Sequence, residues 1–165
     1  MTANTSQPLE FSAKHYLLKD RVALARQWQQ LEQDAEASFF LSWQWIGTWV
    51  AVYPLDLIVL EVLNSEQRLV GLALLHQRDI KRHSLISSKA LYLQQSGLAS
   101  LDQIWIEYNG LLVNRQYQQQ ITATALAYIA HELKWDEFML GGINRDTAEV
   151  YASQLALNSH QLWQA

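Results

Sequence analysis

The sequence predicts an α+β protein with a mixed, mostly antiparallel central sheet flanked by helices. Two apolar runs of strand length, Leu57–Leu63 and Leu69–Ile80, are separated by a polar turn at 64–66, as in an antiparallel hairpin. Segments with apolar residues at helical spacing precede and follow this hairpin. A chain of 165 residues can bury one core, so a single domain over 1–165 is expected.

The first elements are a strand and a helix. A short strand is predicted at His15–Leu18. Asp20 can cap a helix that runs to about Glu36, because its carboxylate accepts a hydrogen bond from a free backbone N–H. The apolar residues of this segment recur on one helical face, at Leu24, Trp28, Leu31 and Ala35.

A second helix is predicted over Trp43–Tyr53. Ser42 can cap its start, and Pro54 ends it because the residue before a proline is driven out of the helical region. The uncharged stretch Ala37–Leu55 is about long enough to cross a bilayer. Its polar residues and its centrally placed tryptophans favour a buried helix over a membrane span.

Short apolar runs predict the other strands, and glycines predict irregularities in them. The runs are Lys89–Gln94, Ile104–Glu107, Leu111–Val113, Phe138–Leu140 and Gln161–Gln164. A β-bulge is expected at Gly71 in the longer hairpin strand. Asn109 and Gly110 are expected to form a tight turn or a bulge.

Two helices are predicted in the second half. The longest helical segment is Arg115–Leu133. Asn144 can cap a last helix, on which Ala148, Tyr151 and Leu155 are at helical spacing.

Composition excludes several classes of function. A net charge of −4 gives no electrostatic footprint for nucleic acid. The absence of cysteine rules out thiolate catalysis, disulfides and Cys-ligated metal, and the five histidines show no ligand spacing, so no metal site is expected. Without cysteine, and without the pattern of a signal peptide, the chain is predicted to be cytoplasmic.

The order of elements resembles the GNAT acyltransferase superfamily. Asn144 and Tyr151 are similar to an Asn and a Tyr on the helix that follows the family's fifth strand. Three phrases look like the first half of the Fem-like acetyltransferases associated with cellulose biosynthesis: FFLSWQWI at 39–46, LVGLALL at 69–75 and EYNGLL at 107–112. Members of that group usually carry two GNAT-like halves, so the resemblance, from about Leu24 to Tyr151, implies one half.

The resemblance implies acyl-CoA-dependent transfer to an amine or hydroxyl acceptor, such as a saccharide, with acetyl-CoA as the co-substrate. Two central strands would splay apart beside the amino end of the longest helix and open a V-shaped slot. Acyl-CoA would lie there against Leu111, Leu112 and Val113, near Arg115 and Asn144.

The phosphate loop of the family is altered in this chain. Aligned on Arg115, the two glycine positions of that loop are occupied by Gln118 and Gln120. Glycines let the backbone approach a pyrophosphate, and side chains at these positions would crowd it. Arg115 would keep one cationic contact, or it is a solvated residue at the start of a helix.

Glu107 and Tyr151 are the candidate catalytic residues. Acyl transfer to an amine needs a base for the amine proton and an acid for the departing thiolate. Glu107 would be the base and Tyr151 the acid. Structural interpretations stay open for both: Glu107 fixes the turn after its strand, and Tyr151 is a core tyrosine with its hydroxyl at the rim.

Two other functions remain open from the sequence. In the first, the chain is a non-catalytic GNAT-like half that binds substrate, or that pairs with a second GNAT-like domain or a second copy through an open sheet edge. In the second, it is a carbohydrate or small-molecule binding module built on its aromatic side chains.

Overall fold

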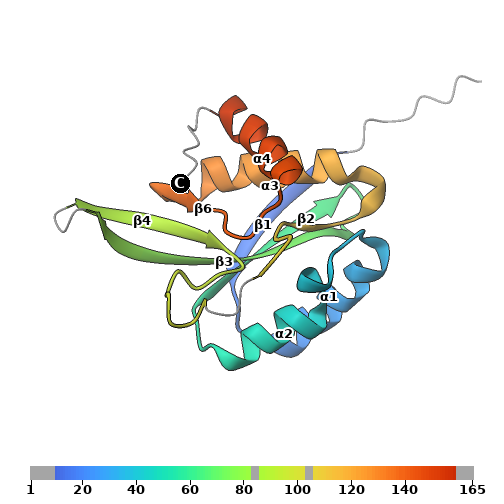
Figure 1. Ribbon diagram of the computed structural model, residues 1–165. Helices are drawn as coiled ribbons and strands as arrows, with labels where there is room; N and C mark the ends of the chain where they lie inside the picture. Colours follow the sequence, from blue (N-terminus) through green and yellow to red (C-terminus); the bar gives the residue numbers. More distant parts are fainter. Residues whose placement is uncertain (1–9, 83–85, 103–105, 159–165) are drawn as a thin grey trace, which may run out of the picture.

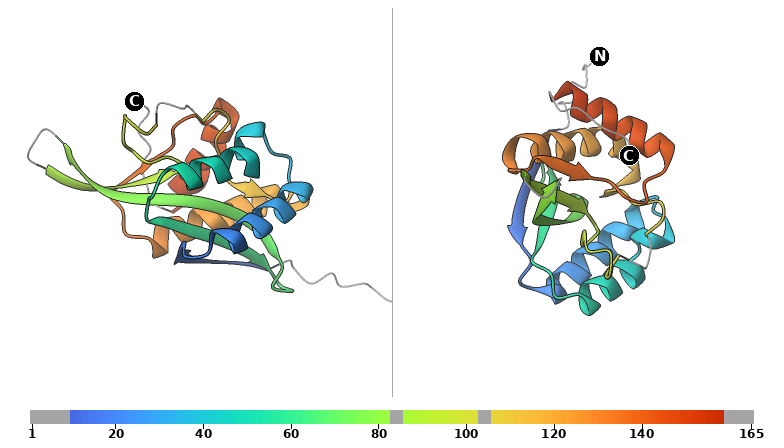
Figure 2. Two further views of the ribbon diagram at one scale, coloured as in Figure 1. Left: turned by 90° about the horizontal axis from the view of Figure 1, so that it is seen from below. Right: turned by 60° about the vertical axis from the view of Figure 1, so that its left-hand side comes forward.

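The computed structural model describes residues 10–82, 86–102 and 106–158 (Figure 1). Within these residues, a six-stranded, mostly antiparallel sheet lies between two helical layers. Helices α1 and α2 cover one face, and α3 and α4 cover the other, as the two further views also show (Figure 2). This arrangement confirms the predicted fold class.

The elements follow one another as listed here: β1 (Phe11–Leu17), α1 (Arg21–Asp34), the 3-10 turn η1 (Phe39–Leu41), α2 (Trp43–Val52), β2 (Leu57–Asn64), β3 (Leu69–Arg82), β4 (Ile86–Leu93), β5 (Leu112–Val113), the 3-10 turn η2 (Arg115–Tyr117), α3 (Gln118–Glu132), β6 (Glu137–Met139) and α4 (Arg145–Leu157). The three predicted N-caps are confirmed. Side chains of Asp20, Ser42 and Asn144 accept hydrogen bonds from the first turns of α1, α2 and α4.

The sheet order is β1-β2-β3-β4-β6, and β5 also pairs with β3. Along β3, Leu75 lies opposite Leu93 of β4, and Leu72 lies opposite Leu112 of β5. Both pairings are antiparallel, so β4 and β5 run in the same direction along one edge of β3. They form one interrupted strand. The chain departs from this interrupted strand after Leu93 and rejoins it at Leu112. We call the segment between them, residues 94–111, the excursion.

The predicted hairpin is present, with its bulge one residue from the expected place. Val62 pairs with Gly71 and Leu63 pairs with Leu69, so Val70 is the extra residue. Gly71 has a different role, because a Cβ there would lie 2.7 Å from Cγ2 of Ile121 in α3. The glycine lets this helix approach the sheet.

Other strand boundaries differ from the predictions. Strand β1 begins at Phe11 and not at His15, because all seven of its residues pair with β2; its exposed, polar positions hide that length in the sequence. Strand β6 covers 137–139 and not 138–140. The strand predicted at Ile104–Glu107 falls partly outside the described residues, and 106–107 are not in a strand; the one predicted at Gln161–Gln164 falls wholly outside them.

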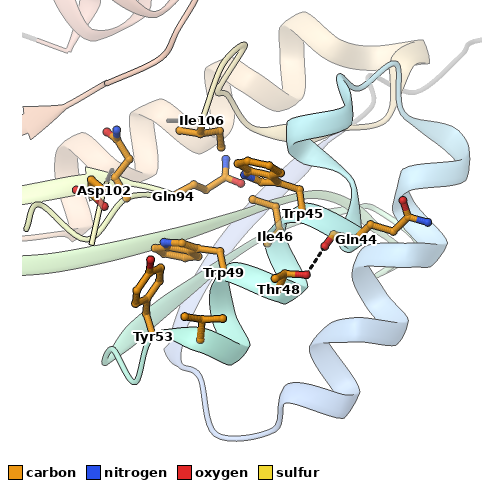
Figure 3. Close-up of a pocket in the computed structure, with 11 residues that line it drawn as sticks. Gln44, Trp45, Ile46, Thr48, Trp49, Tyr53, Gln94, Asp102 and Ile106 are labelled. Carbon is orange, nitrogen blue, oxygen red and sulfur yellow. Dashed lines mark hydrogen bonds between the residues drawn. The ribbon is translucent and has the colours of Figure 1, made fainter. Parts of the chain in front are cut away.

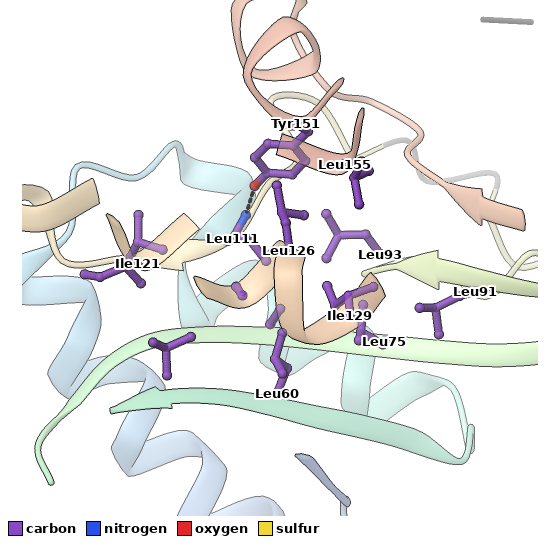
Figure 4. Packing of buried hydrophobic residues seen from close by; sticks show 14 of the residues in the cluster. Leu60, Leu75, Leu91, Leu93, Leu111, Ile121, Leu126, Ile129, Tyr151 and Leu155 are labelled. Carbon is purple, nitrogen blue, oxygen red and sulfur yellow. Dashed lines mark hydrogen bonds between the residues drawn. The ribbon is translucent and has the colours of Figure 1, made fainter. Parts of the chain in front are cut away.

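The two faces of the sheet bury separate halves of the core. Side chains of β3 alternate, so Leu72 and Leu74 pack against α1 and α2, while Ala73 and Leu75 pack against α3 and α4 (Figure 4). The uncharged stretch that raised the question of a membrane forms η1 and the ten-residue α2. In the described part of the chain, no helix combines the length and apolarity needed to cross a membrane.

Candidate functional site

Strands β4 and β6 form the parallel pair of the sheet, and they part after three residue pairs. Asn109, from the end of the excursion, fills the place where they separate. Its side-chain Nδ2 donates to the carbonyl of Leu93 at 2.8 Å and to the carbonyl of Gly141 at 3.0 Å. One amide group therefore replaces the hydrogen bonds that the two strands no longer make with each other.

The other half of the Asn109 amide closes the base of the excursion. Its Oδ1 accepts from Nε2 of Gln94 at 3.0 Å and from the backbone N–H of Gly110 at 2.8 Å. Gln94 and Asn109 are each 2% exposed. The excursion also has left-handed backbone near both ends, with φ of 49° at Gln94 and 52° at Tyr108. An aromatic residue rarely adopts this conformation, so buried contacts must hold it there.

A cleft of about 430 Å³ opens beside this junction. It lies where the end of the excursion meets the first turns of α3 and α4, and we call it the cleft. Its polar walls come mainly from these turns and from the segment after α1. The residues with charged, amide or hydroxyl groups include Glu36, Gln118, Gln119, Asn144, Asp146 and Thr147.

Several predicted site residues are brought together in the cleft, namely Leu111, Val113, Asn144 and Tyr151. Leu112 is not among them. Because side chains alternate along a strand, Leu112 packs on the opposite face of the sheet, against the α1–α2 layer. Asn144 lies at the edge of the cleft, where its Oδ1 accepts from the N–H of Thr147 at 2.8 Å and so caps α4.

Arg115 lies away from the cleft. Its guanidinium donates to the carbonyls of Gln33 at 2.8 Å and Asp34 at 3.2 Å, which belong to the last turn of α1. A cation at this end of a helix is favourable, because unpaired carbonyls and the helix dipole concentrate negative charge there. The positive charge that the resemblance implied for a phosphate therefore stabilises α1.

Glu107 and Tyr151 are not brought together. Glu107 is exposed and is not one of the described residues that line the cleft. Tyr151 is 3% exposed, and its hydroxyl oxygen accepts from the backbone N–H of Leu111 at 2.8 Å (Figure 4). Burial raises the pKa of Tyr151 well above the usual range of a phenol. Its own O–H proton has no acceptor among the described residues, so it can be donated into the cleft.

The electrostatics of the cleft are acidic. Among its described lining residues, the charged side chains are those of Glu36 and Asp146. The first turn of α3 also faces the cleft, and within the described structure no side chain caps it. Gln118 and Gln119 of this turn line the cleft.

Sequence reasoning missed the residues that shape this region. Asn109 was predicted as a turn residue, but it is the bridge between β4 and β6. Gln94, Glu36 and Asp146 were not singled out at all. Glu36 and Asp146 are 110 positions apart in number, and no local pattern connects them. The one sequence signal for a cleft residue was the position of Asp146 near the predicted helix cap Asn144.

The fold and the cleft define an α+β domain with a polar, acidic cleft beside the point where two parallel strands part. In comparisons with known proteins, no family model matches the chain, and neither a curated protein nor a solved structure shows a significant match.

Tyr151→Phe is expected to reduce the free energy of unfolding by about 1–2 kcal/mol, because the buried N–H of Leu111 loses its acceptor. The folded-state pKa of Tyr151 is raised above its unfolded value near 10. The contribution of Tyr151 to the free energy of unfolding is therefore complete below pH 10 and declines at higher pH. The difference in the free energy of unfolding between wild type and variant should narrow above pH 10. Urea unfolding at pH 8 and at pH 10.5 measures both effects.

Tyr117→Phe is the matched control for this substitution. Tyr117 is half-buried and its hydroxyl makes no hydrogen bond with a described residue, so stability should be nearly unchanged. Equal losses in the two variants would contradict the structural role of the Tyr151 hydroxyl.

Proposed function

We propose that this chain is a GNAT-like half without catalytic machinery of its own, and that its cleft binds a neutral, hydroxyl-rich ligand of the saccharide class. The carboxylates of Glu36 and Asp146 carry the proposal, since they are the charged groups among the described residues that line the cleft. The diphosphate of CoA would meet charges of its own sign there, without a cation to offset them.

The other groups that line the cleft suit a saccharide. Amide side chains, as in Gln118 and Gln119, both donate and accept hydrogen bonds, and the carboxylates accept them. Sugar hydroxyls can satisfy both kinds of group. Tyr108, at the rim of the cleft, leaves 58% of its surface exposed and offers an aromatic face to a sugar ring.

The order and pairing of the elements support the GNAT-like part of the proposal. A mixed, mostly antiparallel sheet, followed by α4 with Asn144 at its N-cap and Tyr151 in its middle, agrees with the order of elements on which the resemblance rests. The place of the implied slot is partly filled, because Asn109 bridges the two parting strands. This filling supports a binding role over catalysis.

Acyl-CoA-dependent acyl transfer is the second candidate, and one observation favours it. Tyr151 lines the cleft, and its hydroxyl donates no hydrogen bond to a described residue. In that function Tyr151 would protonate the departing thiolate. Glu107, the predicted base, is exposed and does not line the cleft.

Thermal denaturation with two ligands separates the candidates. A ligand that binds the folded state raises the melting temperature by mass action. We expect millimolar cello-oligosaccharide to raise it and millimolar acetyl-CoA to leave it unchanged. Stabilisation by acetyl-CoA without any response to the oligosaccharide would overturn the proposal in favour of acyl transfer.

A double variant, Glu36→Gln with Asp146→Asn, tests the electrostatic argument. We expect oligosaccharide binding to weaken by about tenfold, because each charge-assisted hydrogen bond to a carboxylate becomes a neutral one. Acetyl-CoA binding should strengthen at low salt, where repulsion is least screened. Isothermal titration calorimetry with both ligands measures these changes.

Glu132→Gln is the control for the double variant. Glu132 is exposed at the far end of α3 and does not line the cleft, so it changes the net charge without changing the site. If it altered binding as much as the double variant, the effect would come from net charge and not from the cleft.

A further inference from the structure

A second hollow, separate from the cleft, lies on the outer side of α2 (Figure 3). We call it the ring pocket. Trp45, Trp49 and Val52 of α2 form one side, and Gln94 and Ile106 of the excursion form the other. Its volume is about 140 Å³. An apolar cavity of about 150 Å³ in another protein holds one benzene molecule, so the ring pocket has room for a single six-membered ring.

One wall of the ring pocket carries an unpartnered acceptor. The side-chain oxygen of Gln94 is buried and accepts no hydrogen bond in the described structure. Its orientation is fixed, because Nε2 of the same amide donates to Oδ1 of Asn109 at 3.0 Å and to the carbonyl of Gly110. Turning the amide over would place its oxygen against two other acceptors. Figure 3 shows this oxygen pointing toward Trp45.

A buried acceptor without a donor is costly, and such groups are rare in folded proteins. Here the acceptor stands in the wall of an apolar, aromatic pocket. We propose that the ring pocket binds a planar six-membered ring bearing one O–H or N–H group, which donates to the Gln94 oxygen while the ring packs against Trp45 and Trp49. Phenols and anilines belong to this chemical class.

The charged side chain among the described residues that line the ring pocket does not favour a cation. Asp102 lines it, but its carboxylate already accepts from the N–H and hydroxyl of Ser96 and from the N–H of Gly97, at 2.7–2.8 Å. These bonds close the loop between Ser96 and Asp102. The Gln94 oxygen differs from the Asp102 carboxylate in being a buried acceptor without a partner in the described structure, so it is the group that a ligand donor can satisfy.

Titration with phenol and with toluene tests the proposal. The two molecules have nearly the same ring and size, and only phenol carries a donor. We expect phenol to bind about tenfold more tightly, as one hydrogen bond to an otherwise unpaired buried acceptor implies. Chemical shifts of the ¹⁵N-labelled indole groups of Trp45 and Trp49 report binding, with resonances assigned from Trp45→Phe and Trp49→Phe.

Val52→Trp is designed to fill the ring pocket. Val52 is 59% exposed, so a larger side chain can be accommodated without disturbing the core. Ala51→Trp adds the same side chain at the neighbouring exposed position, which does not line the pocket. Phenol binding should be lost in the first variant and retained in the second.

Three results would overturn the proposal: no shift of these indole resonances with phenol, equal affinity for phenol and toluene, or phenol binding that survives Val52→Trp. None of them depends on the saccharide proposal, because oligosaccharide binding is measured by calorimetry at the cleft. A failure at one site therefore leaves the other result intact.

Discussion

Asn109→Ala is expected to reduce the free energy of unfolding by about 3–5 kcal/mol, since each buried group left without a partner costs about 1–3 kcal/mol. The Asn109 amide serves four partners, and the residue is 2% exposed. Truncation removes the donors from the carbonyls of Leu93 and Gly141, and it removes the acceptor of Gly110 N–H. It thus damages the junction of β4, β6 and the excursion at once.

Urea unfolding of Asn109→Ala, followed by circular dichroism, measures this loss. The melting temperature should fall by about 6–20 °C, given about 2–4 °C per kcal/mol for a domain of this size. Asn114→Ala is the matched control, because Asn114 is only half-buried and its side chain accepts one hydrogen bond, from Gln116 N–H. A similar, small change in both variants would show that the bridge is not a principal support of the fold.

Gly142→Ala is expected to cost about 3 kcal/mol or more, from left-handed backbone strain together with a steric clash. Gly142 has a φ of +68°, and a Cβ there would lie 1.8 Å from the backbone carbonyl oxygen of Ile106. A backbone atom cannot rotate away as a side chain does. Either the turn before α4 or the end of the excursion must move, and the hydrogen bond from Asn109 N–H to the Gly142 carbonyl would be strained.

Gly141→Ala provides the comparison for Gly142→Ala. A Cβ at Gly141 would meet the side-chain oxygen of Gln95 at 2.4 Å, and this half-buried side chain can turn aside, with loss of the 3.2 Å hydrogen bond that it accepts from Gly141 N–H. We expect a loss of about 1 kcal/mol or less, as is usual where no backbone conflict arises. Denaturant unfolding measures the free energy of unfolding of both variants. A larger loss for Gly141→Ala than for Gly142→Ala would contradict the described geometry of this turn.

The predictable part of the fold is the part that local sequence controls. Asp20, Ser42 and Asn144 cap helices as predicted, because a cap depends on one side chain and the next few N–H groups. The hairpin of β2 and β3 was equally visible, since two apolar runs flank a polar turn. Strand β1 was placed too late and too short, because its partners on β2 lie far along the chain and its exposed face is polar.

The predicted site was only partly assembled by the fold. Leu111, Val113, Asn144 and Tyr151 meet in the cleft, but Leu112 faces the other side of the sheet. The sequence places three consecutive residues near a site, whereas strand alternation lets only every second side chain reach it.

Charge was the hardest property of the site to predict. Arg115 opens a helical segment, from which the resemblance implies a phosphate contact, yet its guanidinium donates to carbonyls at the end of α1. Glu36 lines the cleft from a segment far away in the chain. A side chain's partner depends on which elements become neighbours, and a single sequence does not record this.

By itself, the sequence determined the class of fold, the helix starts and the central hairpin, since these follow from periodicity, caps and turns within a few residues. Only the tertiary structure decided that β4 and β5 are one interrupted strand, that Asn109 bridges the parting strands, and that the cleft is acidic. These features depend on contacts between residues far apart in the chain, and such contacts arise only once the helical layers pack on the sheet.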